Sequence, residues 1–366
     1  MKKVRKVLFY IDMMGHGGAQ RVMWVLMHRF LQYGVQVILV NDFELANGQA
    51  QYSVSGKISR LYLRKSLHGN PILKNIERVY NLRNIVKTES PDVVVSFLGR
   101  PNERMLISTM GLPCKKIVSV RNDPIREYGD HFFSKWLARF LFLLADGCVF
   151  QTHDARKYFL SKTRQESAII KNPVSAIFFN VKQNKAVSNI ISVGRLEKQK
   201  NNTLLIRAFS KIAAKYSDVN LVFYGSGSLK KDLQLLVHKL DLDTRVDFAG
   251  DTDDVPSKLK ECKIFVLSSD FEGMPNALME AMAAGVPCIS TDCPCGGPKE
   301  IIENGKDGIL VSVGNEESLA HALDYLLSNT RARLLIGKNA KEKAKEFTEE
   351  QVVSKWYQYF ENVLNR

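Results

Sequence analysis

The chain has 366 residues, of which 45% are hydrophobic and 25% charged, and its formal net charge at pH 7 is +14. At roughly 100–200 residues per domain the length predicts two domains, and the composition excludes a chain that is disordered along its whole length. No apolar run reaches the ~18 residues of a membrane-spanning helix, and the basic N-terminus leads into a glycine-rich turn rather than the apolar core of a signal peptide, so we expect a cytoplasmic protein.

The first half of the chain alternates short apolar runs with stretches of helical periodicity. The expected strands are residues 4–12, 35–41, 91–98, 117–120 and 147–151. The expected helices are residues 19–33, 72–88 and 132–145. Repeated strand–helix units of this kind are typical of a parallel sheet with helices on both faces.

A polar stretch with little periodicity runs from about residue 170 to residue 189, and we place a domain linker there. The alternation then restarts, with strands expected at 190–193, 219–224, 246–249, 264–267, 287–291 and 309–311. Helices are expected at 202–216, 229–240, 255–262, 275–284, 317–327, 330–346 and 349–364. The sequence therefore predicts an α/β protein with two Rossmann-like, doubly wound domains, residues 1–172 and 173–348, with residues 349–366 returning to the first. Ligands of such sheets bind at the carboxyl ends of the strands, so we expect the chemistry in loops that follow strands, at a cleft between the domains.

The first such loop is residues 15–21, which contains Gly15, Gly17 and Gly18 and opens a helix. Glycines let a backbone approach a ligand closely, and the N–H groups and positive dipole end of the helix favour a phosphate. A dinucleotide fingerprint would need glycine at position 20, where the chain has Gln20, so a tight strand-to-helix turn is an equal alternative.

The second loop, Gly194-Arg195-Leu196 followed by Lys200, lies between an expected strand and an expected helix of the second domain. The arginine can form two hydrogen bonds with phosphate oxygens, and the lysine can add a point charge. A solvated charged loop would have the same composition.

The third loop, within residues 268–285, is the most informative. Pro275 suits the first turn of a helix and Gly285 its C-terminal cap. Glu280 is surrounded in sequence by apolar residues, and a carboxylate there is costly without a partner, which favours a function such as binding two ribose hydroxyls. Glu272 precedes the helix and can bond sugar hydroxyls; its alternative role is to interact with the helix dipole. Residues 224–227 and 295–300 are weaker glycine loops for which a structural turn is nearly as good an explanation.

These motifs resemble family 4 of the retaining glycosyltransferases, which have the GT-B fold and use nucleotide sugars. Residues 17–21 are similar to the family's Gly-Gly-Ala-Glu-Arg, with Gln20 in place of the glutamate. Residues 194–196 with Lys200 are similar to the family's diphosphate-binding motif, and Glu272 and Glu280 match its two glutamates eight positions apart. Residues 296–300 look like a loop that recurs in members that synthesise polysaccharides.

The resemblance implies that Glu272 contacts the donor sugar and Glu280 the ribose. We expect Glu272, Lys200 and Arg195 to be catalytic. The expected donor-binding residues are Gly17, Gly18, Gly194, Arg195, Lys200, Gly225, Glu272, Gly273, Met274, Pro275, Asn276, Ala277 and Glu280. Acceptor contacts are expected at Arg100, Arg121 and Asn122; many family members carry a histidine at the place of Arg121, which here could meet a phosphate instead.

The resemblance further implies transfer with retention of configuration, in which the leaving phosphate accepts the proton of the acceptor. Cationic side chains and helix N-termini would stabilise the departing diphosphate, so we expect no metal ion or other cofactor. The expected donor is a UDP-linked hexose or N-acetylhexosamine, although the sequence leaves GDP open. The expected acceptor is a lipid-linked glycan or a polysaccharide, as in the synthesis of a capsule or lipopolysaccharide.

The positive charge is concentrated in the first half of the chain. Residues 1–170 carry 26 basic and 13 acidic side chains, a balance of +13, whereas residues 171–366 carry 26 and 25, a balance of +1. A basic half suggests an anionic partner, and we expect peripheral contact with the inner face of the cell membrane through the first domain. Residues 132–145, rich in aromatic side chains, could enter such an interface; the alternative is a helix in a core between the domains.

Three other functions remain as alternatives. A nucleotide-sugar epimerase of related fold would need acid–base residues that we cannot place, and a non-catalytic partner subunit would not need to keep Lys200 and Glu272. No nucleic-acid partner is expected, because the sequence contains no zinc finger, helix-turn-helix or aromatic RNA-binding signature. The six cysteines match no zinc or disulfide framework and are expected to be reduced thiols.

Overall fold

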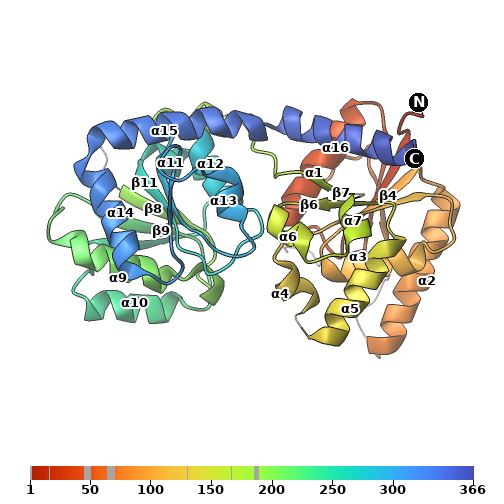
Figure 1. Ribbon diagram of the computed structural model, residues 1–366, viewed down its shortest axis with the longest axis horizontal. Coiled ribbons are helices and arrows are strands. Elements are labelled where there is room, and N and C mark those ends of the chain that lie inside the picture. The colour runs from red at the N-terminus through yellow and green to blue at the C-terminus, as the bar shows by residue number, and fades with distance from the viewer. Residues whose placement is uncertain are drawn as a thin grey trace. The chain divides into compact units, whose positions relative to one another are not determined.

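The computed structural model describes residues 2–15, 17–44, 51–63, 71–129, 131–165, 167–184 and 189–366. The chain forms two compact units: Met1–Pro173 with Glu350–Arg366 is unit 1, and Val174–Glu349 is unit 2. Each unit has a parallel sheet with helices packed against it, as Figure 1 shows. The α/β class with two Rossmann-like domains, predicted from the sequence, is confirmed.

The sheet of unit 1 has seven strands in the order β3-β2-β1-β4-β5-β6-β7, and all of its pairs are parallel. The strands are β1 Lys6–Tyr10, β2 Gln36–Asn41, β3 Ser59–Tyr62, β4 Val93–Phe97, β5 Lys115–Ser119, β6 Gly147–Phe150 and β7 Ser167–Ile169. Every residue of β4 is buried, as expected for a central strand covered on both faces. The two edge strands β3 and β7 were not predicted, because they are short and only partly apolar.

The helices of unit 1 follow the strands in sequence. They are α1 Gly18–Gln32, α2 Pro71–Glu89, α3 Gly99–Ser108, α4 Pro124–Tyr128, α5 Phe132–Leu141, η1 Phe142–Leu144, α6 His153–Lys157 and α7 Ser161–Gln165. The helix expected at 132–145 is therefore α5 followed by one turn of 3₁₀ helix. Helices α3, α4, α6 and α7 were not predicted, and all but α3 are only five residues long.

The C-terminal helix α16, Glu349–Leu364, completes the core of unit 1 (Figure 1). Trp356 stacks on Phe97 with ring centroids 5.6 Å apart, and Phe360 meets Phe30 edge-on at 5.4 Å. The Tyr359 hydroxyl accepts a hydrogen bond of 2.8 Å from the backbone N–H of Cys148 in β6. The predicted return of the C-terminal helix to the N-terminal domain is confirmed.

The sheet of unit 2 has six parallel strands in the order β10-β9-β8-β11-β12-β13. The strands are β8 Asn189–Val193, β9 Asn220–Tyr224, β10 Val246–Gly250, β11 Cys262–Leu267, β12 Cys288–Thr291 and β13 Ile309–Val311. Neighbouring residues of β8, Ile190 and Ile191, belong to different apolar clusters, so the sheet has a core on each face.

The helices of unit 2 are α8 Ala176–Phe179, η2 Lys198–Lys200, α9 Asn202–Ala213, α10 Lys230–Lys239, α11 Val255–Lys260, α12 Asn276–Ala283, α13 Gly297–Ile301, α14 Glu316–Ser328, α15 Thr330–Ala344 and η3 Lys345–Phe347. The short helices α8 and α13 were not predicted. Helix α8 lies in the stretch expected to be a linker, and residues 185–188 of that stretch lie outside the described residues. In the described part of the chain, no helix combines the length and apolar character needed to cross a bilayer.

Candidate active site

Three loops of unit 2 are joined at the carboxyl ends of the neighbouring strands β8, β11 and β12. The backbone N–H of Asp270, after β11, donates to the carbonyl of Gln199 at 2.9 Å, and the Asn201 side chain donates to the Asp270 carboxylate at 2.7 Å. On the other side, the N–H of Glu272 donates to the carbonyl of Pro294, after β12, at 2.7 Å. The loop that carries Glu272 is therefore fixed on both sides.

An ion pair between Lys200 and Glu272 lies where these loops meet. Lys200 Nζ is 2.5 Å from Glu272 Oε1, and the Ser269 hydroxyl donates to the same oxygen at 2.7 Å. The Ser269 carbonyl in turn accepts a bond of 2.6 Å from the Thr291 hydroxyl of β12. The Glu272 carboxylate is buried, and two donors, one of them charged, offset the cost of removing it from water.

Several glycines of unit 2 are required because backbone segments touch at these positions. A Cβ atom on Gly225 would lie 2.1 Å from the carbonyl oxygen of Gly194, and Gly225 has φ +140°. A Cβ atom on Gly297 would lie 1.8 Å from the carbonyl oxygen of Gly273. Gly194 and Gly273 belong to the loops of the ion pair, so the predicted glycine motifs serve to bring these loops together.

Helix α12 begins beside Glu272. The helix starts at Asn276, one residue later than predicted, and Pro275 is its N-cap residue. The side chain of Pro275 forms no capping hydrogen bond. The positive end of the helix dipole therefore lies four residues after Glu272, and the N-cap side chain does not cap it. Met274 and Glu280 are buried, and the exposed fraction of Glu280 is 4%. Asn276 and Ala277 are half-buried.

Arg195, after β8, and Cys293, after β12, belong to the same loops. The Arg195 side chain is exposed, so its guanidinium is accessible to solvent. Cys293, which follows β12, is buried; desolvation, with the negative charge of Glu272, raises the pKa of its thiol to about 12. All six cysteines are free and buried.

Gly17 and Gly18, predicted to bind the donor, belong to unit 1. Gly17 is the N-cap residue of α1 and Gly18 its first residue, and no side chain caps this helix. A Cβ atom on Gly17 would lie 2.3 Å from Gln20 Oε1, so the glutamine packs over the glycine. The loop therefore ends in a helix N-terminus that has no capping side chain.

Arg121 follows β5 and is buried. It donates to the Asn172 side chain and lies over the Phe97 ring at 4.8 Å. Burial lowers its pKa to about 9, and the negative charge of Glu127 opposes this effect. Burial likewise raises the pKa of the Glu127 carboxyl to about 8. The predicted acceptor residue Arg121 is thus held in the interior, next to Asn122, which is half-buried.

Unit 1 also has a polar pocket of about 700 Å³ at the carboxyl ends of β1 and β2. Its lining residues are Asp12, Asp42, Phe43, Asn75, Arg78, Val79, Arg100, Pro101, Glu103, Arg104 and Ile107. Arg100 was predicted from the sequence, and the others were not. The position of Asp12 at the end of one predicted strand and of Asp42 directly after the next is the signal that could have indicated the pocket.

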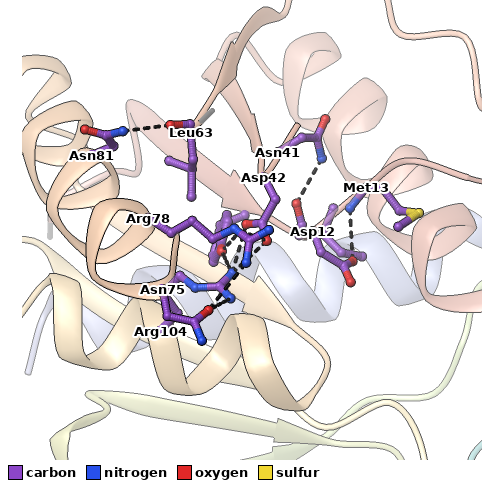
Figure 2. A network of polar contacts seen from close by, with 11 residues as sticks. Asp12, Met13, Asn41, Asp42, Leu63, Asn75, Arg78, Asn81 and Arg104 are labelled. Atoms are coloured by element: carbon purple, nitrogen blue, oxygen red, sulfur yellow. Dashed lines mark hydrogen bonds and ion pairs between the residues drawn. The ribbon is translucent and has the colours of Figure 1, made fainter. Parts of the chain in front are cut away.

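Asp42 is the centre of the network in this pocket (Figure 2). It accepts a hydrogen bond of 2.7 Å from the Tyr10 hydroxyl, and Arg104 Nη1 lies 2.9 Å from its Oδ1. Arg78 Nε lies 3.1 Å from its other oxygen. Two guanidinium groups therefore share one buried carboxylate. Burial raises the pKa of both Asp12 and Glu103.

No group of three or more His, Cys, Asp and Glu side chains in the described residues is arranged to hold a metal ion. The polar chemistry visible at the described sites comes from guanidinium, ammonium, carboxylate and hydroxyl groups and from helix N-termini.

The sequence and the fold both match known proteins. The family model of the glycosyl transferases group 1 matches residues 175–343, which is nearly all of unit 2. An uncharacterised glycosyltransferase of Methanocaldococcus jannaschii is 28% identical over 353 residues, covering 81% of this chain and 86% of that protein. A Campylobacter jejuni N-acetylgalactosamine-N,N'-diacetylbacillosaminyl-diphospho-undecaprenol 4-alpha-N-acetylgalactosaminyltransferase is 28% identical over 367 residues, covering 94% of this chain and 96% of that protein.

Solved structures with the GT-B fold superpose on the whole chain. Anabaena HepE in complex with UDP has a TM-score of 0.80 at 16% identity, covering 98% of this chain and 100% of that one. Sucrose-phosphate synthase of Thermosynechococcus elongatus has a TM-score of 0.84 at 15% identity, covering 99% of both chains. The chain is therefore a glycosyltransferase with the GT-B fold, and its residues 175–343 match the model of the glycosyl transferases group 1.

Proposed function

We propose that the chain is a retaining glycosyltransferase of family 4 that transfers a hexose or N-acetylhexosamine from a UDP-linked donor to a lipid-linked glycan or polysaccharide. The observation that carries the proposal is the Lys200–Glu272 pair, with Nζ and Oε1 2.5 Å apart, beside the start of α12. A cation, a hydrogen-bonded carboxylate and an uncapped helix N-terminus together suit a sugar diphosphate.

In this proposal unit 2 binds the donor. The Lys200 ammonium and the exposed Arg195 guanidinium neutralise the diphosphate, to which the first N–H groups of α12 also donate. Glu272 accepts hydrogen bonds from hydroxyls of the donor sugar, and Glu280 from the ribose. Held by Ser269 and Lys200, Glu272 loses little freedom when the sugar binds.

The reaction follows from the same groups. As the sugar–phosphate bond breaks, negative charge grows on the leaving diphosphate, and Lys200, Arg195 and the helix N-terminus stabilise it. The leaving oxygen accepts the proton of the acceptor hydroxyl, which attacks the sugar carbon from the same face. This route needs no enzymic nucleophile and no metal ion or other cofactor.

Unit 1 binds the acceptor in this proposal, through the pocket around Asp42. The guanidinium groups of Arg78, Arg100 and Arg104 offer donors for phosphate or sugar oxygens, and the carboxylates of Asp12 and Glu103 accept from hydroxyls. Two relatives from Campylobacter jejuni carry names that specify acceptors linked to diphospho-undecaprenol. A lipid-linked acceptor would require the enzyme to work at a membrane, at its cytoplasmic face.

The test is a screen of nucleotide sugars for slow hydrolysis by the purified chain, followed by transfer to a diphospholipid-linked glycan. We expect one UDP-sugar to be hydrolysed and its sugar to be transferred with the anomeric configuration kept, as read by NMR of the product. Absence of hydrolysis and of thermal stabilisation with every nucleotide sugar would overturn the proposal.

A further inference from the structure

Helix α5 of unit 1 has its apolar face in solvent. The exposed fractions of Phe132, Phe133, Trp136, Leu137 and Phe140 are 85%, 70%, 44%, 41% and 47%, and these five residues are called the α5 face below. Ala138 is the helix's one buried residue. A surface helix of a soluble protein normally has its apolar side against the core. Helix α5 instead has its apolar side exposed to solvent. The α5 face therefore takes no part in the core of unit 1.

The polar side of α5 holds the helix in this orientation. Arg139 Nε donates to the Tyr158 carbonyl at 2.5 Å, and its guanidinium lies 5.3 Å from the centre of the Tyr158 ring. Lys135 Nζ lies 5.5 Å from the same ring. On the opposite side Trp136 and Phe140 are in contact, with ring centroids 4.6 Å apart. The exposed aromatic side chains are therefore presented by a fixed helix.

Most of the exposed large hydrophobic side chains of unit 1 fall within one stretch of its sequence, which includes α5. Among the residues described there, thirteen large hydrophobic side chains are exposed, and Tyr33 is the only one outside residues 73–144. The other twelve are Leu73, Ile76, Tyr80, Ile107, Met110, Ile125, Phe132, Phe133, Trp136, Leu137, Phe140 and Leu144. Single exposed hydrophobic residues are ordinary, but the five of the α5 face lie on one ten-residue helix and mark an interaction surface.

Charge indicates which partner this surface fits. Residues 1–170 have a balance of +13, and α5 itself contains Lys135 and Arg139 but no acidic residue. A protein partner could match the apolar side chains, but aromatic and leucine side chains beside lysine and arginine are the combination that suits the headgroup region of an anionic bilayer. Helix α3 packs against both α5 and α2, and its Ile107 also lines the pocket around Asp42.

We propose that the α5 face inserts into the interfacial region of an anionic lipid bilayer. This proposal rests on the proposed function, because a lipid-linked acceptor has its diphosphate at the depth of the lipid headgroups. Insertion of the α5 face would bring the pocket, through the shared helix α3, next to the lipid headgroups.

The experiment is co-sedimentation of the full chain with vesicles of phosphatidylcholine alone or mixed with phosphatidylglycerol. We expect at least tenfold stronger binding to the anionic vesicles, and at least a tenfold loss in the double variant Phe133→Ser/Trp136→Ser. The matched control, Leu334→Ser/Leu335→Ser, removes two exposed apolar side chains from α15 of unit 2 and should bind like wild type. Equal binding by the α5 variant and wild type would overturn the proposal.

A second measurement does not depend on the stability of that variant. The fluorescence of Trp136, taken as wild type minus Trp136→Phe, should shift to shorter wavelength with anionic vesicles and be quenched by brominated lipid. An unchanged spectrum would overturn the proposal, as would a dimer in solution that the α5 variant abolishes while vesicle binding persists. Donor hydrolysis separates the two claims. Normal hydrolysis without vesicle binding would contradict only the α5 proposal. Vesicle binding without hydrolysis would contradict only the proposed function.

Discussion

Lys200 and Glu272, 72 residues apart in the chain, meet with Nζ and Oε1 2.5 Å apart at the carboxyl ends of the neighbouring strands β8 and β11. The Ser269 hydroxyl bonds to the same carboxylate oxygen, so the pair forms a fixed polar centre. Structures in which charged groups are held this way before the ligand binds avoid reorganisation during the reaction.

Neutralising either member of this pair should reduce turnover by about 10²–10³-fold, the cost of removing one preorganised electrostatic contact. We expect this for Glu272→Gln, which keeps the shape of the side chain, and for Lys200→Met. Steady-state kinetics with donor and acceptor would measure the loss, and circular dichroism would check folding. The control is Lys211→Met, which breaks a surface pair with Glu317 on the same unit and should leave turnover unchanged. Wild-type turnover in folded Glu272→Gln would contradict the assignment.

Gly297→Ala should destabilise the donor loops. Its new Cβ atom would lie 1.8 Å from the Gly273 carbonyl, so the backbone must shift, at a cost of about 1–3 kcal/mol. We expect a lower melting temperature and weaker UDP binding by calorimetry. Gly56→Ala is the control, since a Cβ atom there meets nothing within 4 Å. Equal melting temperatures for the two variants would show that the loops do not touch as described.

The stability of unit 1 should depend on pH through Glu127. Burial raises the pKa of its carboxyl from 4.5 to about 8, so the folded state keeps a proton that the unfolded state has already released between these values. Stability from this group is therefore present below pH 4.5 and is lost as the pH rises toward 8. Glu127→Gln removes the effect, so its free energy of unfolding relative to wild type should increase from pH 5 to pH 8. A difference that is constant over this range, in urea titrations, would contradict the buried state of Glu127.

Arg100→Ala should affect the acceptor and not the donor. The side chain is exposed at the edge of the pocket around Asp42, so its removal deletes a charge without disturbing the core. We expect the KM for a diphosphate-bearing acceptor to rise about tenfold, the worth of one charge-assisted hydrogen bond, with donor hydrolysis unchanged. Lys57→Ala, an equal change of charge at another exposed site of unit 1, is the control and should leave KM as in wild type. An unaltered KM for Arg100→Ala would remove the pocket from the acceptor site.

Turnover should not require a divalent metal, because Lys200, Arg195 and the start of α12 supply the positive charge that the leaving diphosphate needs. Dialysis against EDTA should change kcat by less than twofold. A loss of activity that Mg²⁺ or Mn²⁺ restores would mean that these groups are insufficient and that the proposed mechanism is incomplete.

The alternation of strands and helices could be predicted from the sequence because buried parallel strands are continuous apolar runs and the helices between them have clear periodicity. The edge strand β3, Ser59–Tyr62, contains serine and arginine and has no buried residue, so its pattern does not differ from a loop. Helix α3 was missed because it begins Gly99-Arg100-Pro101, which has the composition of a turn.

The residues of the proposed donor-binding loops could be recognised from sequence motifs, but the contacts between these residues could not. The apolar neighbours of Glu280 predicted that its carboxylate needs a partner, and the structure shows the side chain buried. The pairing of Lys200 with Glu272 depends on the order of β8 and β11 in the sheet, which no local pattern contains. The network of Asp42 with Tyr10 and Arg104 joins residues up to 94 positions apart and was missed for the same reason.

The most direct test of the account is a crystal structure of the chain with a bound UDP-sugar. We predict that diphosphate oxygens lie within hydrogen-bonding distance of Lys200 Nζ and the Arg195 guanidinium, at the start of α12, with the ribose hydroxyls on Glu280 and the sugar on Glu272. A nucleotide bound elsewhere, or one that leaves Lys200 in contact with Glu272 alone, would contradict the central claim.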